Sequence, residues 1–179
     1  MSVYILLRSD EMNIEKSKSD DIGEIMEIIA EAQASLRALE IDQWQDGYPS
    51  ANVILEDIAA GVGYVVRDED GTVIATAHVS FDGEPTYEQI CGGVWLTDGQ
   101  YAVIHRIAVA NRAKRSGAAA FVISAAREWC SELGTRSIRI DTHEGNLPMQ
   151  GVLMKYGFTE CGFIFLANGD RRVAYELAL

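Results

Sequence analysis

The residues best suited to chemistry lie in one stretch, residues 103–129, where a predicted strand runs through a basic loop into a predicted helix. Four of the chain's 15 Lys and Arg residues fall within ten positions here: Arg106, Arg112, Lys114 and Arg115. Gly117 and three alanines then open the helix. Backbone N–H groups at a helix N-terminus bind phosphate, and a glycine lets the ligand come close to the backbone. The stretch therefore predicts an anion-binding loop; the alternative is a solvated basic turn.

A second group of ionisable residues follows a later predicted strand: Asp141, His143 and Glu144. Imidazole and carboxylate ligands can hold a metal, with His105 as a fourth ligand. No two histidines stand at the i, i+4 spacing that a helix-borne zinc site uses, so we expect no metal. Glu144 is then expected either to attract a cationic amine or act as a base, or to cap the helix that follows Asn146.

The composition narrows the function classes. The 179 residues are 48% hydrophobic, which is enough for one domain with a core of its own. A net charge of −12 excludes nucleic acid and anionic membranes as default partners, but it allows a small anion at a local basic patch. No apolar run reaches the roughly 18 residues of a membrane span. Three widely spaced cysteines predict reduced thiols and a cytoplasmic location.

The hydrophobic pattern predicts the elements that must position these residues. Helices are predicted at 21–40, 52–60, 117–133 and 147–156, the first with a capping box of Asp21 and Glu24, the second between Ser50 and Gly61. Strands are predicted at 13–18, 64–66, 73–81, 101–109, 137–142, 158–166 and 173–177. Residues 82–99 are rich in Gly and Asp and predict a loop or a distorted ribbon. The mixture predicts a mixed α/β domain.

The order of these elements and several short motifs resemble the GNAT superfamily of acyl-CoA-dependent N-acyltransferases. The family's apolar-Ala-Val triplet is matched by Ile107-Ala108-Val109, and its Arg/Gln-x-x-Gly-x-Gly/Ala loop by Lys114–Ala119, with Lys in the first position. Asn146 stands eleven residues before Gly157-Phe158, as in the family. The resemblance covers 13–179 and implies a mixed, mostly antiparallel sheet of about six to seven strands with about four helices.

Residues 1–12 are, on this reading, an N-terminal extension of the GNAT-like domain at 13–179. The extension is either dispensable or an added edge strand.

The resemblance also implies a co-substrate, acetyl-CoA, and the residues that bind it. Backbone N–H groups of the loop would surround the pyrophosphate: Lys114, Arg115, Ser116, Gly117, Ala118 and Ala119. Main-chain groups of Ile107, Ala108 and Val109 would meet the acetyl carbonyl and the pantetheine arm, and Asn146 would hydrogen-bond the pantetheine region. In the family a bulge in this strand opens a gap toward the strand at 137–142, where the thioester enters.

Acetyl transfer to an amine needs a base, an oxyanion donor and a leaving thiolate. His105 is the expected base, because it precedes Ile107 by two residues on one side of the strand and imidazole titrates near neutral pH. The alternative is a structural histidine. Where many family members have a tyrosine as acid, this chain has Leu153, so the acid is Tyr156, water or nothing. Tyr156 has the alternative role of a ring packed in the core.

The resemblance implies a primary amine of a small molecule or peptide as the acceptor, and the acidic chain favours a cationic acceptor over an anionic one. Trp44 and Tyr48 lie in the loop that walls the acceptor site in GNAT-like proteins; alternatively they pack the first two helices together. Direct transfer is expected, since no Cys-His pair or G-x-S-x-G motif offers a covalent nucleophile. The rival functions are a non-catalytic acyl-CoA-binding module and a structural partner-binding domain. The family also makes a homodimer through the C-terminal strands plausible.

Overall fold

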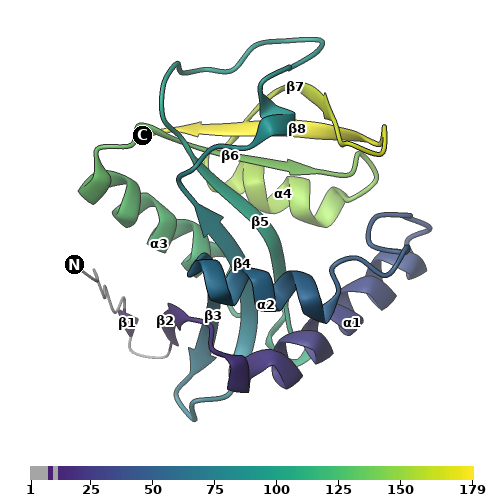
Figure 1. Cartoon of the computed structure of the whole chain (residues 1–179), viewed down its shortest axis with the longest axis vertical. Helices are drawn as coiled ribbons and strands as arrows, with labels where there is room; N and C mark the ends of the chain where they lie inside the picture. Colours follow the sequence, from purple (N-terminus) through teal and green to yellow (C-terminus); the bar gives the residue numbers. More distant parts are fainter. Residues whose placement is uncertain (1–7, 10–11) are drawn as a thin grey trace. The chain divides into compact units, whose positions relative to one another are not determined.

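A computed structural model describes residues 8–9 and 12–179 (Figure 1). The chain divides into two compact units. The first unit runs from β1 to His78 and includes Arg106–Ala125; the second comprises Val79–His105 and Ala126–Leu179. Within the described residues, no helix is long and apolar enough to cross a membrane.

The first unit is an antiparallel sheet covered by two helices. Its strand order is β1-β2-β3-β4-β5. Its elements are β1 (Arg8–Ser9), β2 (Met12–Lys16), α1 (Ile22–Ala38), α2 (Ala51–Ala60), β3 (Gly63–Asp68), and the parts of β4 (Val73–Ser80), β5 (Ala102–Val109) and α3 (Ala118–Leu133) that fall within it. Helix α2 packs against both α1 and β3 (Figure 1). Ile14, Ile25, Ile29 and Val65 are almost fully buried between these layers, as the predicted helical and strand periods require.

The ends of α2 confirm the predicted signals. The Ser50 hydroxyl accepts a hydrogen bond from the Val53 N–H, which satisfies one of the orphan donors of the first turn. Gly61 ends the helix in a left-handed conformation (φ +70°) that a glycine adopts without strain. These two residues set where α2 begins and ends.

The predicted capping box of Asp21 and Glu24 is wrong. Asp21 instead accepts from the Lys18 N–H at 2.8 Å, closing a short 3₁₀ turn, and it pairs with Arg67 at 2.6 Å. Glu24 accepts from the Val73 N–H, 3.1 Å away. Both carboxylates are taken by partners outside the helix end: Asp21 by a guanidinium on β3, which adds charge to the hydrogen bond, and Glu24 by a backbone N–H at the start of β4.

The second unit holds the parallel part of the sheet. Its strand order is β5-β6-β8-β7, with β5 parallel to β6 and the other two pairs antiparallel. Its further elements are β6 (Ser137–Thr142), α4 (Leu147–Lys155), β7 (Thr159–Phe165) and β8 (Arg171–Ala178). The predicted fold class is thus confirmed: the described part of the chain has seven strands, with the two-residue β1 as an eighth, and four α-helices.

A buried ion pair fixes the long loop that joins β4 to β5. Arg139 of β6 donates to Glu176 of β8 at 3.1 Å and to the Thr97 carbonyl at 2.7 Å. Its guanidinium lies between the rings of Trp95 and Tyr101, 4.3 and 4.0 Å from their centroids. Burial raises the pKa of Glu176, but hydrogen bonds, first from Thr97, outweigh burial and hold that pKa below its usual value. The loop that the sequence predicts is therefore an ordered strap across the sheet.

The strap also approaches β7 closely. Cys91 and Phe163 exchange backbone hydrogen bonds of 2.8 and 2.9 Å, and Gly93 lies against the backbone of Cys161 and Gly162. Only a glycine fits at position 93, because a Cβ there would overlap the Cys161 carbonyl oxygen.

Part of the predicted extension can be located. Arg8–Ser9 pairs with β2 as an edge strand, and Met12 lies in β2, one residue before the expected domain start. Residues 1–7 and 10–11 lie outside the described residues. The boundary at 12/13 stays a prediction.

We expect Gly93→Ala to destabilise the protein by about 1–3 kcal/mol, because overlap with the Cys161 backbone can be relieved only by moving the strap. The matched control is Gly151→Ala in α4, where a Cβ meets nothing within 4 Å. That control should gain about 0.5–1 kcal/mol by reducing the freedom of the unfolded chain. Thermal denaturation measures both, and equal melting temperatures would contradict the close approach.

Candidate active site

The backbone of β5 changes direction in the middle of the strand. Arg106 has a φ of +55°, a left-handed value that is unusual for a residue with a side chain. The pairing of β5 with β6 covers Ala102 with Ile138 and Val103 with Arg139, three residues before this point. An irregular residue in a strand leaves backbone groups near it without their ladder partners. The family resemblance predicts a bulge in this strand, and the positive φ of Arg106 is the irregularity that the structure places there.

The predicted anion loop has the geometry of a backbone cradle. A 3₁₀ turn (Asn111–Ala113) leads to Arg115 and Gly117, which both have positive φ values, +69° and +93°. Helix α3 begins at Ala118, so the N–H groups of its first turn have no acceptor within the helix. A Cβ at Gly117 would meet nothing within 4 Å, so the space beside it is open. These features fit a phosphate group held by main-chain N–H groups.

Three of the four basic residues that the sequence groups together have separate partners. Arg112 donates to the Val73 carbonyl at 2.6 Å, and Lys114 donates to the Ser35 hydroxyl at 3.0 Å. Arg106 is engaged by Asp57, as described below. Within residues 8–9 and 12–179, no hydrogen bond or ion pair engages the exposed Arg115. Arg112 and Lys114 keep their charge, because their acceptors are neutral, so the predicted basic loop stays a prediction.

Arg106 is the centre of a polar cluster in the first unit. Its Nε and Nη2 donate to the two carboxylate oxygens of Asp57 on α2, at 3.0 and 2.7 Å. Nη1 donates to the Tyr48 hydroxyl, and the guanidinium carbon lies 5.9 Å from the centroid of that ring. His78 Nδ1 lies 2.8 Å from Arg106 Nη2 and 2.9 Å from Asp57 Oδ1. Burial raises the pKa of Asp57, but the hydrogen bond with His78 and the charge of Arg106 outweigh it and lower the pKa overall.

His105, the expected base, lies between two carboxylates of the second unit. Its Nε2 is 3.1 Å from Glu84 Oε2, in the strap, and its Nδ1 is 3.7 Å from Asp141 Oδ1, on β6. The Tyr87 hydroxyl donates to the same Asp141 oxygen at 2.7 Å. The ring of Tyr87 is tilted against the imidazole, with centroids 5.9 Å apart. His105 is thus both half-buried and oriented from each side of its ring.

Two of these groups have displaced pKa values. The hydrogen bond with His105 lowers the pKa of Glu84 to about 2, against the opposing effect of burial, and Thr86 adds two more hydrogen bonds. Burial and the Asp141 carboxylate raise the pKa of Tyr87 well above its usual value. Glu84 is therefore ionised at neutral pH, while the Tyr87 hydroxyl keeps its proton and remains a donor.

The remaining predicted residues of the second unit lie around α4. Asn146 is the N-cap, and its side-chain oxygen accepts from the Met149 N–H, which leaves its amide nitrogen for the predicted pantetheine contact. Tyr156 is the half-buried C-cap residue, with the Lys155 ammonium 5.6 Å from its ring. Glu144 is exposed and faces Arg171 at 3.6 Å. Leu153 is fully buried and presents no polar group.

The predicted acceptor loop is held to α1. Gln45 bonds to the Gln33 carbonyl and receives a hydrogen bond from Arg37, while Gln33 donates to the Tyr48 carbonyl. Trp44 is half-buried with a φ of +66°. Tyr48 is 39% exposed and reaches Arg106, so it is not simply a packing residue between two helices.

Sequence reasoning missed Asp57, Glu84 and Asp141 as partners of the residues on β5. Asp57 carried a usable signal: it is a carboxylate on the apolar, sheet-facing side of an amphipathic helix, where a buried charge needs a partner. Glu84 carried no such signal, because its loop has no period that orients side chains. Among the described residues, no group of three or more His, Cys, Asp or Glu is arranged to hold a metal.

Comparison with known proteins identifies the family. Residues 29–158 match the family model described as "Acetyltransferase (GNAT) family". The chain is 28% identical over 127 residues to an aminoglycoside N(6')-acetyltransferase type 1 of Serratia marcescens, covering 69% of this chain and 82% of that protein. A GNAT-family acetyltransferase structure from Streptococcus agalactiae is 35% identical, with a TM-score of 0.82 and 94% and 95% of the two chains covered.

A GNAT-family structure from Listeria monocytogenes shares the fold at 19% identity, with a TM-score of 0.72 over 94% and 95% of the chains. The family match spans well over half of the chain and includes β5, the loop and α3. The chain therefore belongs to the acetyltransferase (GNAT) family and is an acyltransferase.

Proposed function

We propose that this enzyme transfers an acetyl group directly from acetyl-CoA to a primary amine. The observation that carries the proposal is the segment from Ile107 to Ala119, where an interrupted strand leads through two positive-φ residues to an open helix start. The loop residues Lys114–Ala119 would hold the pyrophosphate, and main-chain groups of Ile107, Ala108 and Val109 would meet the acetyl carbonyl and the pantetheine arm. The family generally uses acetyl-CoA, which agrees with this geometry.

In the proposed reaction the amine nitrogen attacks the thioester carbonyl carbon. The N–C bond forms, the negative charge that develops on the oxygen is met by a main-chain N–H of β5, and the C–S bond breaks with sulfur leaving as thiolate. A thiol pKa near about 8.5 makes that departure feasible without a strong acid. The attacking amine loses one proton, which a base must accept.

His105 is the proposed base, and its contacts favour one of its two ring nitrogens as the proton acceptor. The ionised Glu84 carboxylate can only accept a hydrogen bond, so Nε2 carries the hydrogen that it donates across 3.1 Å. In the neutral ring, Nδ1, which lies 3.7 Å from Asp141 Oδ1, is then the nitrogen proposed to take the proton, directly or through water. Tyr156, at the C-cap of α4, and Glu144, in its exposed pair with Arg171, are the alternative groups.

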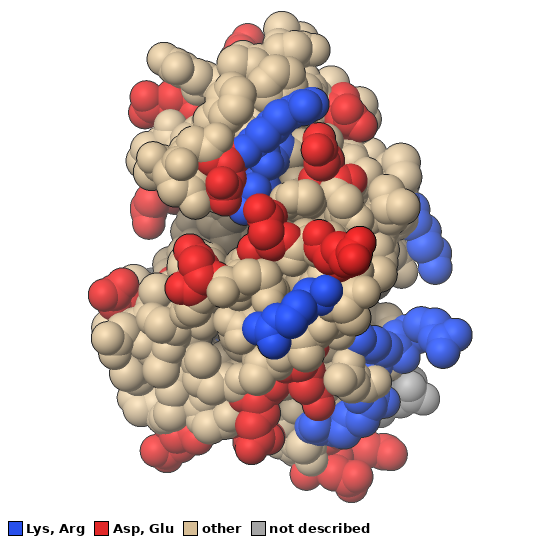
Figure 2. Space-filling model, turned by 90° about the vertical axis from the view of Figure 1, so that its right-hand side faces the viewer, with Lys and Arg blue, Asp and Glu red and all other residues tan. Residues whose placement is uncertain are grey.

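The proposed acceptor is a cationic small molecule or peptide amine. Acidic side chains are spread over the face seen in Figure 2, with Lys and Arg between them, and the chain carries a charge of −12. Such a surface attracts ammonium groups. The aminoglycoside acetyltransferase relative is named for an amine-bearing small molecule, which points in the same direction. Trp44 and Tyr48, in the loop before α2, are the proposed acceptor contacts; the homodimer and the cytoplasmic location stay predictions.

A non-catalytic acyl-CoA-binding module is the second candidate. The observation that favours it is Leu153, buried at the position where many family members have an acidic tyrosine. In that case CoA binds but no amine is acetylated. Binding and turnover must therefore be measured separately.

Binding of acetyl-CoA and CoA is expected to raise the melting temperature by several degrees, because a ligand at 100 times its dissociation constant adds about 2.7 kcal/mol. Gly117→Glu should weaken binding roughly tenfold or more, since a carboxylate in the open space would repel the pyrophosphate. Gly117→Gln is the matched control: it has the same backbone strain and side-chain size without the charge. Equal affinity in the Glu and Gln variants would overturn the loop assignment.

His105→Ala is expected to lower kcat by about 10²-fold, the scale of general-base catalysis, and to leave the CoA dissociation constant nearly unchanged. Tyr156→Phe and Glu144→Gln should keep kcat within about threefold if His105 carries the proton. Turnover is followed by release of the free thiol with a panel of primary amines. Wild-type kcat in His105→Ala would remove this residue from the mechanism.

The carboxyl of Glu84 is expected to titrate with a pKa of about 2, to be measured by carbon NMR of the side chain. In His105→Ala the pKa should rise toward the ordinary value of about 4.5, because the largest lowering interaction is lost. Since the folded-state pKa is depressed, Glu84 contributes stability above pH 4.5 that is lost as the pH falls toward 2. The same pKa in both proteins would show that His105 does not contact Glu84.

A further inference from the structure

The left-handed backbone at Arg106 needs something to hold it. A residue with a Cβ keeps this conformation only where its surroundings stabilise it. Ile104 and Ala108, two residues to either side in β5, do not have a positive φ. Glycine would adopt the conformation freely, but the chain has a long charged side chain here. The side chain is therefore the place to look for the restraint.

The Arg106 side chain is fixed at every polar atom. The Asp57 carboxylate accepts hydrogen bonds from both Nε and Nη2, and this bidentate geometry fixes the plane of the guanidinium as well as its position. The Tyr48 hydroxyl accepts a hydrogen bond from Nη1, and His78 Nδ1 lies within hydrogen-bond distance of Nη2, at 2.8 Å. The side chain of Arg106 is 12% exposed and that of Asp57 is 11% exposed, so water competes weakly for these bonds.

Asp57 is itself held rigidly. It lies in the last turn of α2, and its backbone carbonyl accepts from the Gly61 and Val62 N–H groups, the latter at 3.0 Å. Its Cβ and carbonyl carbon pack against Gly63, where a side chain would be in contact with them. Its carboxylate is ionised, because the His78 hydrogen bond and the Arg106 charge outweigh burial in lowering its pKa. A charge placed in this way on a helix is suited to orient a partner.

We propose that Asp57 is a positioning residue: by gripping Arg106 it holds the left-handed kink of β5, and so aims the main-chain groups of the following residues, Ile107 to Val109, at the acyl group. This inference rests on the proposed function for its effect on catalysis. Its structural part, that the carboxylate of α2 sets the backbone at Arg106, does not depend on that function.

Tyr48 links Arg106 to the acceptor loop. Its hydroxyl accepts a hydrogen bond from Nη1 of the guanidinium, and its carbonyl accepts one from the side chain of Gln33 on α1. Loss of the Tyr48 hydroxyl alone leaves both Asp57 bonds in place. Tyr48→Phe should therefore change the KM for the amine more than kcat, while Asp57 variants should do the reverse.

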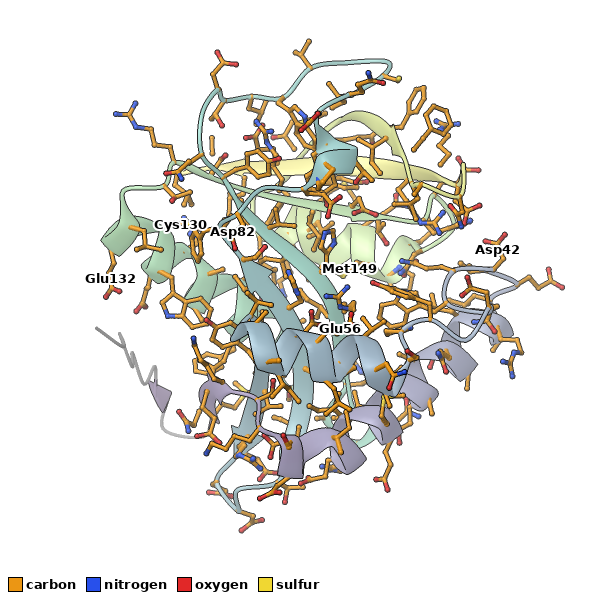
Figure 3. The ribbon with its side chains drawn as sticks, viewed as in Figure 1. Asp42, Glu56, Asp82, Cys130, Glu132 and Met149 are labelled. Carbon is orange, nitrogen blue, oxygen red and sulfur yellow. The ribbon has the colours of Figure 1, made fainter. Side chains whose placement is uncertain are left out.

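The test compares Asp57→Asn with Glu56→Gln, a matched loss of charge at the preceding position of the same helix. Glu56 is exposed on α2 and takes no part in the cluster (Figure 3). We expect Asp57→Asn to lower kcat about tenfold or more, with the CoA dissociation constant changed less than about threefold, because a misaimed main-chain donor affects the reaction step. Glu56→Gln should behave as wild type.

A rescue distinguishes positioning from a general structural role. Arg106→Gly removes the side chain but permits the left-handed backbone. In that background Asp57→Asn should change kcat less than about twofold, and the double variant should exceed Asp57→Asn alone. If the double variant is no better than the single one, or Asp57→Asn keeps wild-type kcat, the proposal is overturned. Should Asp57→Asn not fold, Asp57→Glu, which keeps the charge but displaces it, takes its place.

A measurement without catalysis separates this inference from the proposed function. The Cα chemical shift of Arg106 reports its backbone conformation, and the 19.7 kDa chain is small enough for NMR assignment. The shift should move in Asp57→Asn and stay in Glu56→Gln and Tyr48→Phe. An unchanged shift in Asp57→Asn overturns the inference even if the enzyme acetylates amines. A changed shift in a protein that acetylates no amine would support the grip and overturn the proposed function.

Discussion

A side chain in left-handed conformation inside a strand is the constraint around which the chemistry of β5 is built. Arg106 can hold φ at +55° only because its guanidinium is bound in a fixed plane by Asp57. The side chain of the preceding residue, His105, hydrogen-bonds to another carboxylate, Glu84. Two successive residues of one strand are thus each oriented by an acidic partner. Because the backbone of β5 is irregular here, its N–H and C=O groups do not all point at a neighbouring strand. Such unpaired groups are what a strand needs in order to bind a ligand.

The acidic composition has a structural use in these places. Asp57 is mostly and Glu84 partly shielded from water, and both carry lowered pKa values and orient a basic side chain. Glu176 does the same for Arg139 in the core of the second unit. Buried ion pairs add little net stability, because desolvation opposes the attraction. Their effect here is one of geometry: each pair fixes a loop or a kink whose backbone alone would have several conformations. A surplus of carboxylates over Lys and Arg supplies such partners.

The parts of the fold that follow local rules were predictable. The bounds of β6, the Ser50 and Gly61 ends of α2 and the positive φ at Gly117 follow from residue type and period alone. The capping box at Asp21 and Glu24 failed because those carboxylates found partners about 46 and 49 residues away, Arg67 and Val73. The pairs of Arg106 with Asp57 and of His105 with Glu84 were unpredictable for the same reason. They span 49 and 21 residues, and no local period encodes them.

The same difference between local and distant sequence signals applies to the two parts of the proposed reaction, binding of the acetyl donor and activation of the acceptor amine. The donor is met by main-chain groups, which nearly any sequence provides once a glycine such as Gly117 permits the turn, so short motifs suffice to recognise it. The base and the acceptor are met by side chains from a strap and an inter-helix loop, Glu84 and Tyr48 among them. Loops vary without disturbing the core that carries them. Relatives that share the fold can therefore keep one donor chemistry while their acceptors differ, and the identity of the amine must be sought in the contacts of β5 rather than in the motif that follows it.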